Sequence, residues 1–130
     1  HDIPMSIATS NTRSTLELFL PQYGIDGYFH SLHFTCEVGR GKPYPDVFLD
    51  AAKALDVPPE HCLVFEDTLE GIQGAKAAGM SVISVDDALQ SHRLETIKES
   101  SLHHIQSFRE LMTPDFSKHF YRRLSHADSF

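Results

Sequence analysis

Short β-rich runs alternate with stretches of helical periodicity along most of the chain. The β-rich runs predict strands at 6–8, 33–35, 62–65 and 81–85. Between them, apolar residues recur at the helical spacing, which predicts helices from about 12, from 45 and over 68–78. Proline is a poor interior helix residue, so we expect Pro21 to end the first of these helices early. The alternation predicts an α/β fold with a parallel sheet.

The pattern is less regular after residue 86. It predicts a helix over 88–98, a short strand over 102–105 and a helix over 107–111. We therefore expect one domain over 1–112, followed by a tail over 113–130. The aromatic residues of that tail would suit either an interaction segment or a loosely attached chain end.

Composition and charge exclude several classes of protein. The 130 residues carry a formal net charge of -7, whereas proteins that bind nucleic acid usually present a basic surface. No apolar run approaches the roughly 20 residues that span a bilayer. Cys36 and Cys62 are the only cysteines and make no disulfide framework. We therefore expect a cytoplasmic protein that binds neither nucleic acid nor membrane.

Polar residues follow three of the predicted strands or the loops after them. They are Thr9, Ser10 and Asn11, then Lys42, then Glu66 and Asp67. The carboxyl ends of parallel strands form the ligand crevice of an open sheet, so these groups are candidates for one site. Each also has an ordinary alternative: a helix cap, a solvated loop lysine, or acids that favour a helix start.

The chemistry of the three groups suits a phosphate and a metal ion. Hydroxyl and backbone N–H donors where a strand gives way to a helix favour an anion. Lys42 is a flexible point charge with three donors. Two adjacent carboxylates supply the hard oxygen ligands that Mg²⁺ prefers. Pro43 follows the lysine where a Walker phosphate loop needs Ser or Thr, so that motif is excluded.

Three segments, 5–11, 41–46 and 65–80, resemble the second, third and fourth motifs of the haloacid dehalogenase superfamily. The resemblance is greatest to the subgroup of β-phosphoglucomutase-like and pseudouridine-5′-phosphatase-like enzymes. It implies a three-layer Rossmann-like core and a Mg²⁺-dependent phosphatase. Thr9 and the N–H groups of Ser10 and Asn11 would bind the phosphoryl group, and Lys42 would hold phosphate and nucleophile. Asp67 would ligate Mg²⁺ directly, with Glu66 as a second ligand or acting through water.

The first motif of that superfamily, an Asp-x-Asp that carries the nucleophile and the general acid, has no counterpart here. No two acidic residues stand two positions apart anywhere in the chain. The resemblance therefore implies a C-terminal part of a longer protein, in which the central nucleophile strand and the helical cap are missing. It implies that this strand would lie between the strand before Thr9 and the strand before Glu66. We expect the chain alone to have no turnover, because nothing in it can form the covalent intermediate.

Several functions fit these motifs. The leading expectation is a phosphatase that acts on a sugar phosphate or a nucleoside monophosphate. A phosphomutase is the near alternative, since it differs only in what receives the phosphoryl group. A dehalogenase fits less well, because Glu66 and Asp67 form a metal-type pair that metal-free members do not need. The alternative from another class is a non-catalytic binding or regulatory protein.

Overall fold

Five short strands and their flanking helices make up residues 3–114, the part of the chain that this computed structural model describes. The strands are β1 (Ser6–Thr9), β2 (Ser31–Phe34), β3 (Leu63–Glu66), β4 (Ser81–Val85) and β5 (His103–Ile105). The α-helices are α1 (Arg13–Gln22), α2 (Asp46–Leu55), α3 (Leu69–Ala77) and α4 (Leu94–Ser100). Short 3-10 helices lie at Asp26–Tyr28, Thr35–Glu37, Pro59–His61, Ala88–Arg93 and Phe108–Met112. None of the helices in this part of the chain is long and apolar enough to cross a membrane.

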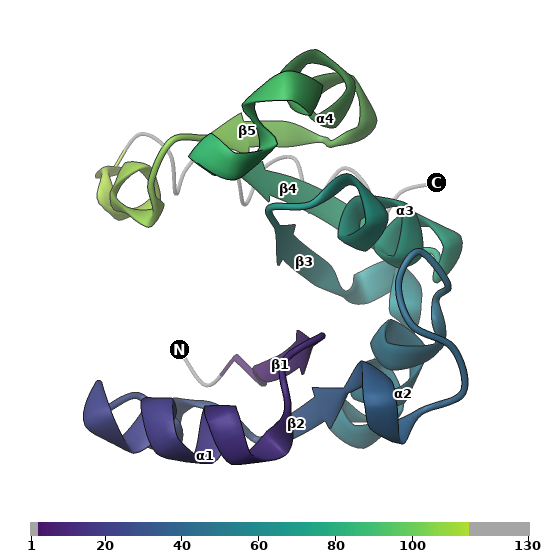
Figure 1. Ribbon diagram of the computed structural model, residues 1–130, viewed down its shortest axis with the longest axis vertical. Coiled ribbons are helices and arrows are strands. Elements are labelled where there is room, and N and C mark those ends of the chain that lie inside the picture. The colour runs from purple at the N-terminus through teal and green to yellow at the C-terminus, as the bar shows by residue number, and fades with distance from the viewer. Residues whose placement is uncertain (1–2, 115–130) are drawn as a thin grey trace.

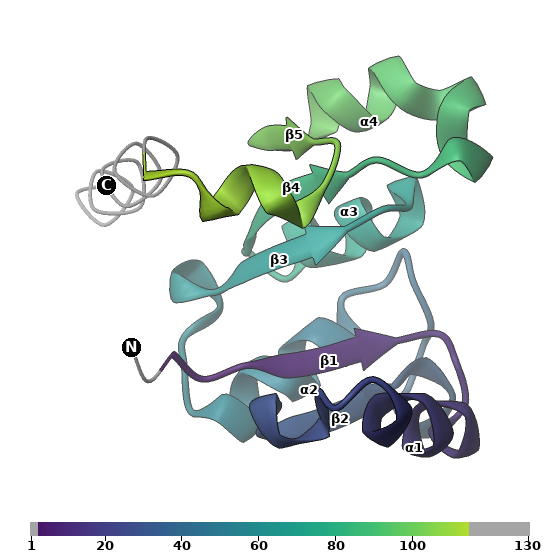
Figure 2. The same cartoon turned by 90° about the vertical axis from the view of Figure 1, so that its left-hand side faces the viewer.

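All the strand pairs are parallel, and helices lie on both sides of the strands (Figures 1 and 2). The predicted α/β class with a parallel sheet is therefore confirmed. Two sheets are present among the described residues, one of order β1-β2 and one of order β3-β4-β5. β1 and β3 face each other without being paired. The unpaired gap between β1 and β3 is called the break below. It lies where the resemblance implied that a central strand is missing.

Apolar side chains gather in two clusters of different size. The larger joins α2, α3, β4 and α4 through Val47, Phe48, Ala52, Ile72, Ala75, Ala78, Met80, Val82 and Ile97. The smaller lies under α1 and consists of Leu16, Leu20 and Phe34. Helix α2 also packs against β1 and β2, so it connects the two sheets on one side of the break.

The prediction that Pro21 ends the first helix early is wrong, because α1 continues to Gln22 with Pro21 inside it. The proline lies in the last turn, where only one intrahelical hydrogen bond is lost to its missing N–H. The chain turns away at Gly24, whose φ is +66°. Phe19 and Tyr23 are exposed and stack on each other with ring centroids 6.4 Å apart.

The later elements match the prediction in position more than in type. The expected helix over 88–98 is a 3-10 segment followed by α4, and the expected helix over 107–111 is a 3-10 segment. Gly79 follows the end of α3 and has a φ of +85°. A glycine in this left-handed conformation is a common helix stop, as the sequence predicted. The proposed tail over 113–130 lies almost wholly outside the described residues.

Candidate active site

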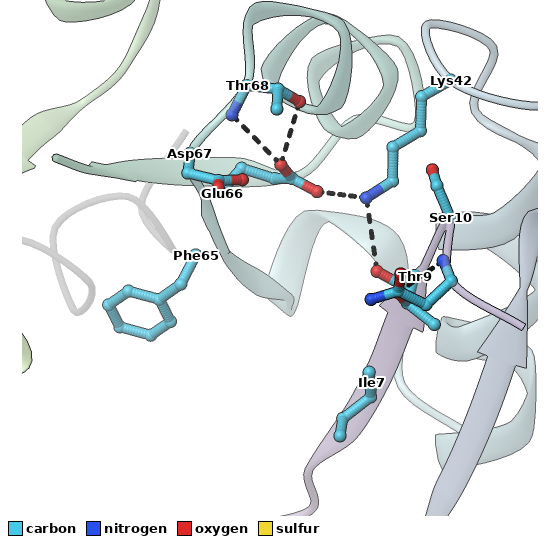
Figure 3. Close-up of a pocket in the computed structure, with 10 residues that line it drawn as sticks. Ile7, Thr9, Ser10, Lys42, Phe65, Glu66, Asp67 and Thr68 are labelled. Carbon is cyan, nitrogen blue, oxygen red and sulfur yellow. Dashed lines mark hydrogen bonds and ion pairs between the residues drawn. The ribbon is translucent and has the colours of Figure 1, made fainter. Parts of the chain in front are cut away.

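A cavity of about 340 Å³ lies at the carboxyl ends of β1 and β3, across the break between the two sheets. Its lining consists of Ile7, Ala8, Thr9, Ser10, Asn11, Lys42, Phe65, Glu66, Asp67 and Thr68. All six residues predicted from the sequence are among them. The structure thus brings together groups from three separate segments of the chain, as Figure 3 shows for the labelled side chains.

The β1 side of the cavity is a turn stabilised by its own side chains. The Thr9 hydroxyl accepts a hydrogen bond from the Asn11 N–H at 3.0 Å. The cap of α1 is the next residue, Thr12, whose side chain accepts from the Thr15 N–H. Thr9, Ser10 and Asn11 are therefore not the helix cap, which was the ordinary alternative for them. They precede the cap and line the cavity instead.

Lys42 reaches across the break and joins the two sheets. Its side chain is only 11% exposed, so it is not the solvated loop lysine of the alternative interpretation. Its ammonium group donates to the Ala8 carbonyl of β1 at 3.3 Å and forms an ion pair with the Glu66 carboxylate of β3 (Figure 3). The amine lies 5.2 Å from the centre of the Phe48 ring, so α2 supports it from one side.

Glu66 is buried against the start of α3. Its carboxylate is within hydrogen-bond distance of the Thr68 N–H at 3.5 Å and the Thr68 hydroxyl at 3.4 Å. It can lie there because Gly71 has no side chain: a Cβ on that residue would come within 2.1 Å of the carboxylate. The burial of this acid is offset by Lys42, since a buried charge needs a partner and hydrogen bonds.

Asp67 differs from its neighbour in exposure. It is exposed at the rim of the same cavity, whereas Glu66 is 7% exposed and bound to Lys42. Among residues 3–114 there is no group of three or more His, Cys, Asp or Glu side chains that could hold a metal. One or two carboxylates are nevertheless what Mg²⁺ takes from a protein when waters and phosphate oxygens complete its shell. The acid pair therefore fits part of a magnesium site.

Two residues that shape the site were not predicted from the sequence. Thr68 binds Glu66 and also caps α3 by accepting from the Gly71 N–H at 3.1 Å. Its position three residues before a glycine in a helix-start pattern is a signal that could have identified the cap. Nothing local could have identified Gly71 as the space for a carboxylate, because that contact depends on how β3 and α3 pack.

Comparisons with known proteins show what the chain is similar to. The family model described as haloacid dehalogenase-like hydrolase matches residues 1–79. The chain is 34% identical over 110 residues to the bifunctional riboflavin kinase/FMN phosphatase of Arabidopsis thaliana, covering 84% of this chain and 29% of that protein. It is 39% identical over 82 residues to the fructose-1-phosphate phosphatase YqaB of Escherichia coli, covering 63% and 44%.

Solved structures show the same arrangement of elements. The crystal structure of CbbY from Rhodobacter sphaeroides in complex with phosphate matches with a TM-score of 0.76 and 28% identity, covering 84% of this chain and 48% of that one. In each of these three matches the chain spans less than half of its relative.

Proposed function

Because the chain belongs to the haloacid dehalogenase-like hydrolase family, we propose that it serves the Mg²⁺-dependent hydrolysis of a small phosphomonoester. A sugar phosphate or a nucleoside monophosphate is the proposed substrate class. Two relatives named as an FMN phosphatase and a fructose-1-phosphate phosphatase support that class. The observation that carries the proposal is the convergence of Thr9, Lys42 and Asp67 on one cavity.

The proposed roles follow from the chemistry of each side chain. Thr9 and the backbone N–H groups after it would hold oxygens of the phosphoryl group, since its hydroxyl keeps a proton to donate while it accepts from Asn11. Lys42 would place a positive charge beside the phosphate. Its low exposure strengthens that effect, because charges interact more strongly away from water.

Magnesium is the proposed cofactor, with Asp67 as the direct ligand. Glu66 is held by Lys42 and Thr68, so we assign it to the outer shell or to a ligand role that requires Lys42 to release it. The ion would neutralise charge on the phosphoryl oxygens. These two carboxylates are the protein groups that would hold it.

The nucleophile must come from a residue outside this chain. The chain has no two acids spaced as in Asp-x-Asp, and the nucleophilic strand would have to reach the cavity. The break between β1 and β3 is a suitable place, because both strands turn an unpaired edge toward it. We propose that a longer protein inserts that strand there, and that the 130-residue chain alone is inactive.

We place this protein in the reducing cytoplasm, where Cys36 and Cys62 stay free thiols.

A panel of phosphomonoesters, assayed with and without Mg²⁺, tests the proposal. The full-length protein should release inorganic phosphate only with the metal, and the 130-residue chain should release none. Phosphate release also separates a hydrolase from a phosphomutase, which would return an isomerised sugar phosphate. A full-length protein inactive on every ester would favour the non-catalytic alternative.

Two substitutions test the assignment of residues in the full-length enzyme. Lys42→Ala should lower kcat by about 10²–10³-fold, the usual loss for one preorganised charge-stabilising group. Asp67→Asn should weaken the apparent affinity for Mg²⁺ and lower the rate. Asp86→Asn is the matched control, because Asp86 follows β4 and does not line the cavity. Full activity of Asp67→Asn would exclude it as the metal ligand.

A further inference from the structure

The loop that carries Lys42 has no regular secondary structure, yet it places the lysine amine across the break between the sheets. One carboxylate anchors this loop. Asp46, the first residue of α2, accepts a hydrogen bond from the Arg40 N–H at 2.9 Å through Oδ2. Its other oxygen lies 3.6 Å from the Arg40 guanidinium. A rigid helix is thereby connected to the loop two residues before the lysine.

The approach of Asp46 to the loop depends on a glycine. A Cβ on Gly39 would lie 2.6 Å from the Asp46 Oδ2, a distance that real Cβ atoms essentially never show. Gly41 lies on the other side of Arg40 and has room, since its Cβ would meet only the Thr35 Cβ at 3.8 Å. The two glycines of the loop therefore differ: one is required by the carboxylate, and the other is not.

Tyr44, on the C-terminal side of Lys42, also contacts the loop. The Arg40 guanidinium lies over the Tyr44 ring, 4.0 Å from its centre. The Tyr44 N–H donates to the Gly41 carbonyl at 3.0 Å. Lys42 lies between these two contacts, so fixing Arg40 also restricts the backbone from which the lysine projects.

We propose that Asp46 is a positioning residue that holds the loop so that Lys42 points into the cavity. The same helix contributes Phe48 beside the lysine amine, so α2 restrains Lys42 both at its backbone and near its charge. A lysine side chain has four rotatable bonds, and a mobile backbone beneath it would spread its ammonium over many positions. The catalytic consequence rests on the proposed function, whereas the geometric claim does not.

Competitive acylation of lysines in the full-length protein, read by mass spectrometry, tests this without turnover or phosphate. Lys42 is nearly buried and ion-paired, so it should react slowly compared with the exposed Lys53, Lys76 and Lys98. In Asp46→Ala its acylation rate should rise by about two- to tenfold, the equilibrium effect of losing one hydrogen bond. The other three lysines should keep their rates.

Three further variants separate positioning from a general effect on the fold. Asp46→Asn keeps an acceptor oxygen and should restore the slow rate of Lys42 to within about twofold. Gly39→Ala disturbs the same contact from the loop side and should also raise the rate, which covers the case that Asp46→Ala does not fold. Gly41→Ala is the matched control and should leave the rate unchanged.

Three results would overturn the proposal. One is an unchanged Lys42 rate in Asp46→Ala and Gly39→Ala. The second is an equal rise at Lys42, Lys53, Lys76 and Lys98, because it would mean a general loosening. The third is Asp46→Asn as reactive as Asp46→Ala, because it would exclude the hydrogen bond as the cause. None of these results depends on whether the enzyme hydrolyses a phosphomonoester.

Discussion

The central strand of the larger sheet, β4, is buried more deeply than β1, the strand that carries Thr9 beside the cavity. In β4, the central strand of the larger sheet, Val82, Ile83 and Ser84 are at most 2% exposed. In β1, at the edge of the smaller sheet, every residue from Ser6 to Thr9 is only partly buried. β4 has a hydrogen-bonded neighbour on each side, whereas β1 has one.

The candidate site therefore lies on edge strands and not on the buried centre of the larger sheet. β3, which presents Glu66 and Asp67, pairs with the buried β4 on one side only. β1, which presents Thr9, likewise has one paired edge, and such regions open at lower free energy than a core. Lys42 and α2 connect the two, so the placement of the site depends on contacts that cross the break.

Polar side chains strengthen both sheets, but in different surroundings. In the smaller sheet, the Ser6 and Ser31 hydroxyls lie 2.6 Å apart, and His33 connects Ser31 to the half-exposed Asp50. In the larger sheet, the fully buried Ser84 hydroxyl contacts His104 at 2.7 Å. Side-chain hydrogen bonds therefore lie at a fully buried position in the larger sheet and reach a half-exposed carboxylate in the smaller one.

The largest expected effect compares a fully buried residue of β4 with a residue of the smaller apolar cluster. Ile83→Ala should lower the free energy of unfolding by about 4 kcal/mol, because the Ile83 side chain is fully buried and its removal leaves a cavity. Leu16→Ala should cost about 2 kcal/mol, since its cluster is smaller and partly open to water. Urea unfolding followed by circular dichroism measures both. Equal losses would contradict the expected difference in packing between these two positions.

A smaller effect is expected where Glu66, the carboxylate that binds Lys42, packs against α3. Gly71→Ala should lower the free energy of unfolding by about 1–2 kcal/mol, because displacing the Glu66 carboxylate outweighs the gain of about 1 kcal/mol in helix propensity. Gly27→Ala is the matched control, with nothing within 4 Å of its Cβ, and should stay within about 0.5 kcal/mol. A more stable Gly71→Ala protein would show that the carboxylate does not need this space.

The smallest effect concerns a surface ion pair of the larger sheet's helices. Glu70→Gln should cost about 0.2–1 kcal/mol at neutral pH, because Arg93 and Glu70 are both well exposed. The hydrogen bond from Arg93 lowers the pKa of the Glu70 carboxyl below its ordinary value of 4.5. The contribution is therefore present above that value and is lost as the pH falls through the lowered pKa. Urea unfolding of both proteins should show their difference closing in acid, and a difference that persists there would exclude the ionised pair as its cause.

The local pattern of residues predicted much of the framework. Strands near 62–65 and 81–85, the helix over 68–78 and its stop at Gly79 all follow from short-range rules of periodicity and capping. The same short-range rules failed at Pro21, where the position within the last turn decided the outcome. The three polar groups were also visible, because parallel strands carry their carboxyl ends to one edge.

Only the tertiary structure decided which of those groups are buried and which are exposed at the cavity. Glu66 and Asp67 are adjacent in sequence, yet one is buried against Lys42 and the other is exposed at the cavity. That difference depends on the space above Gly71, on a lysine 24 residues earlier in the chain, and on an unpaired break between two strands. The lysine contact and the break involve segments far apart in the chain, and the space above Gly71 depends on how β3 packs against α3. Propensity and periodicity act only over a few residues along the chain.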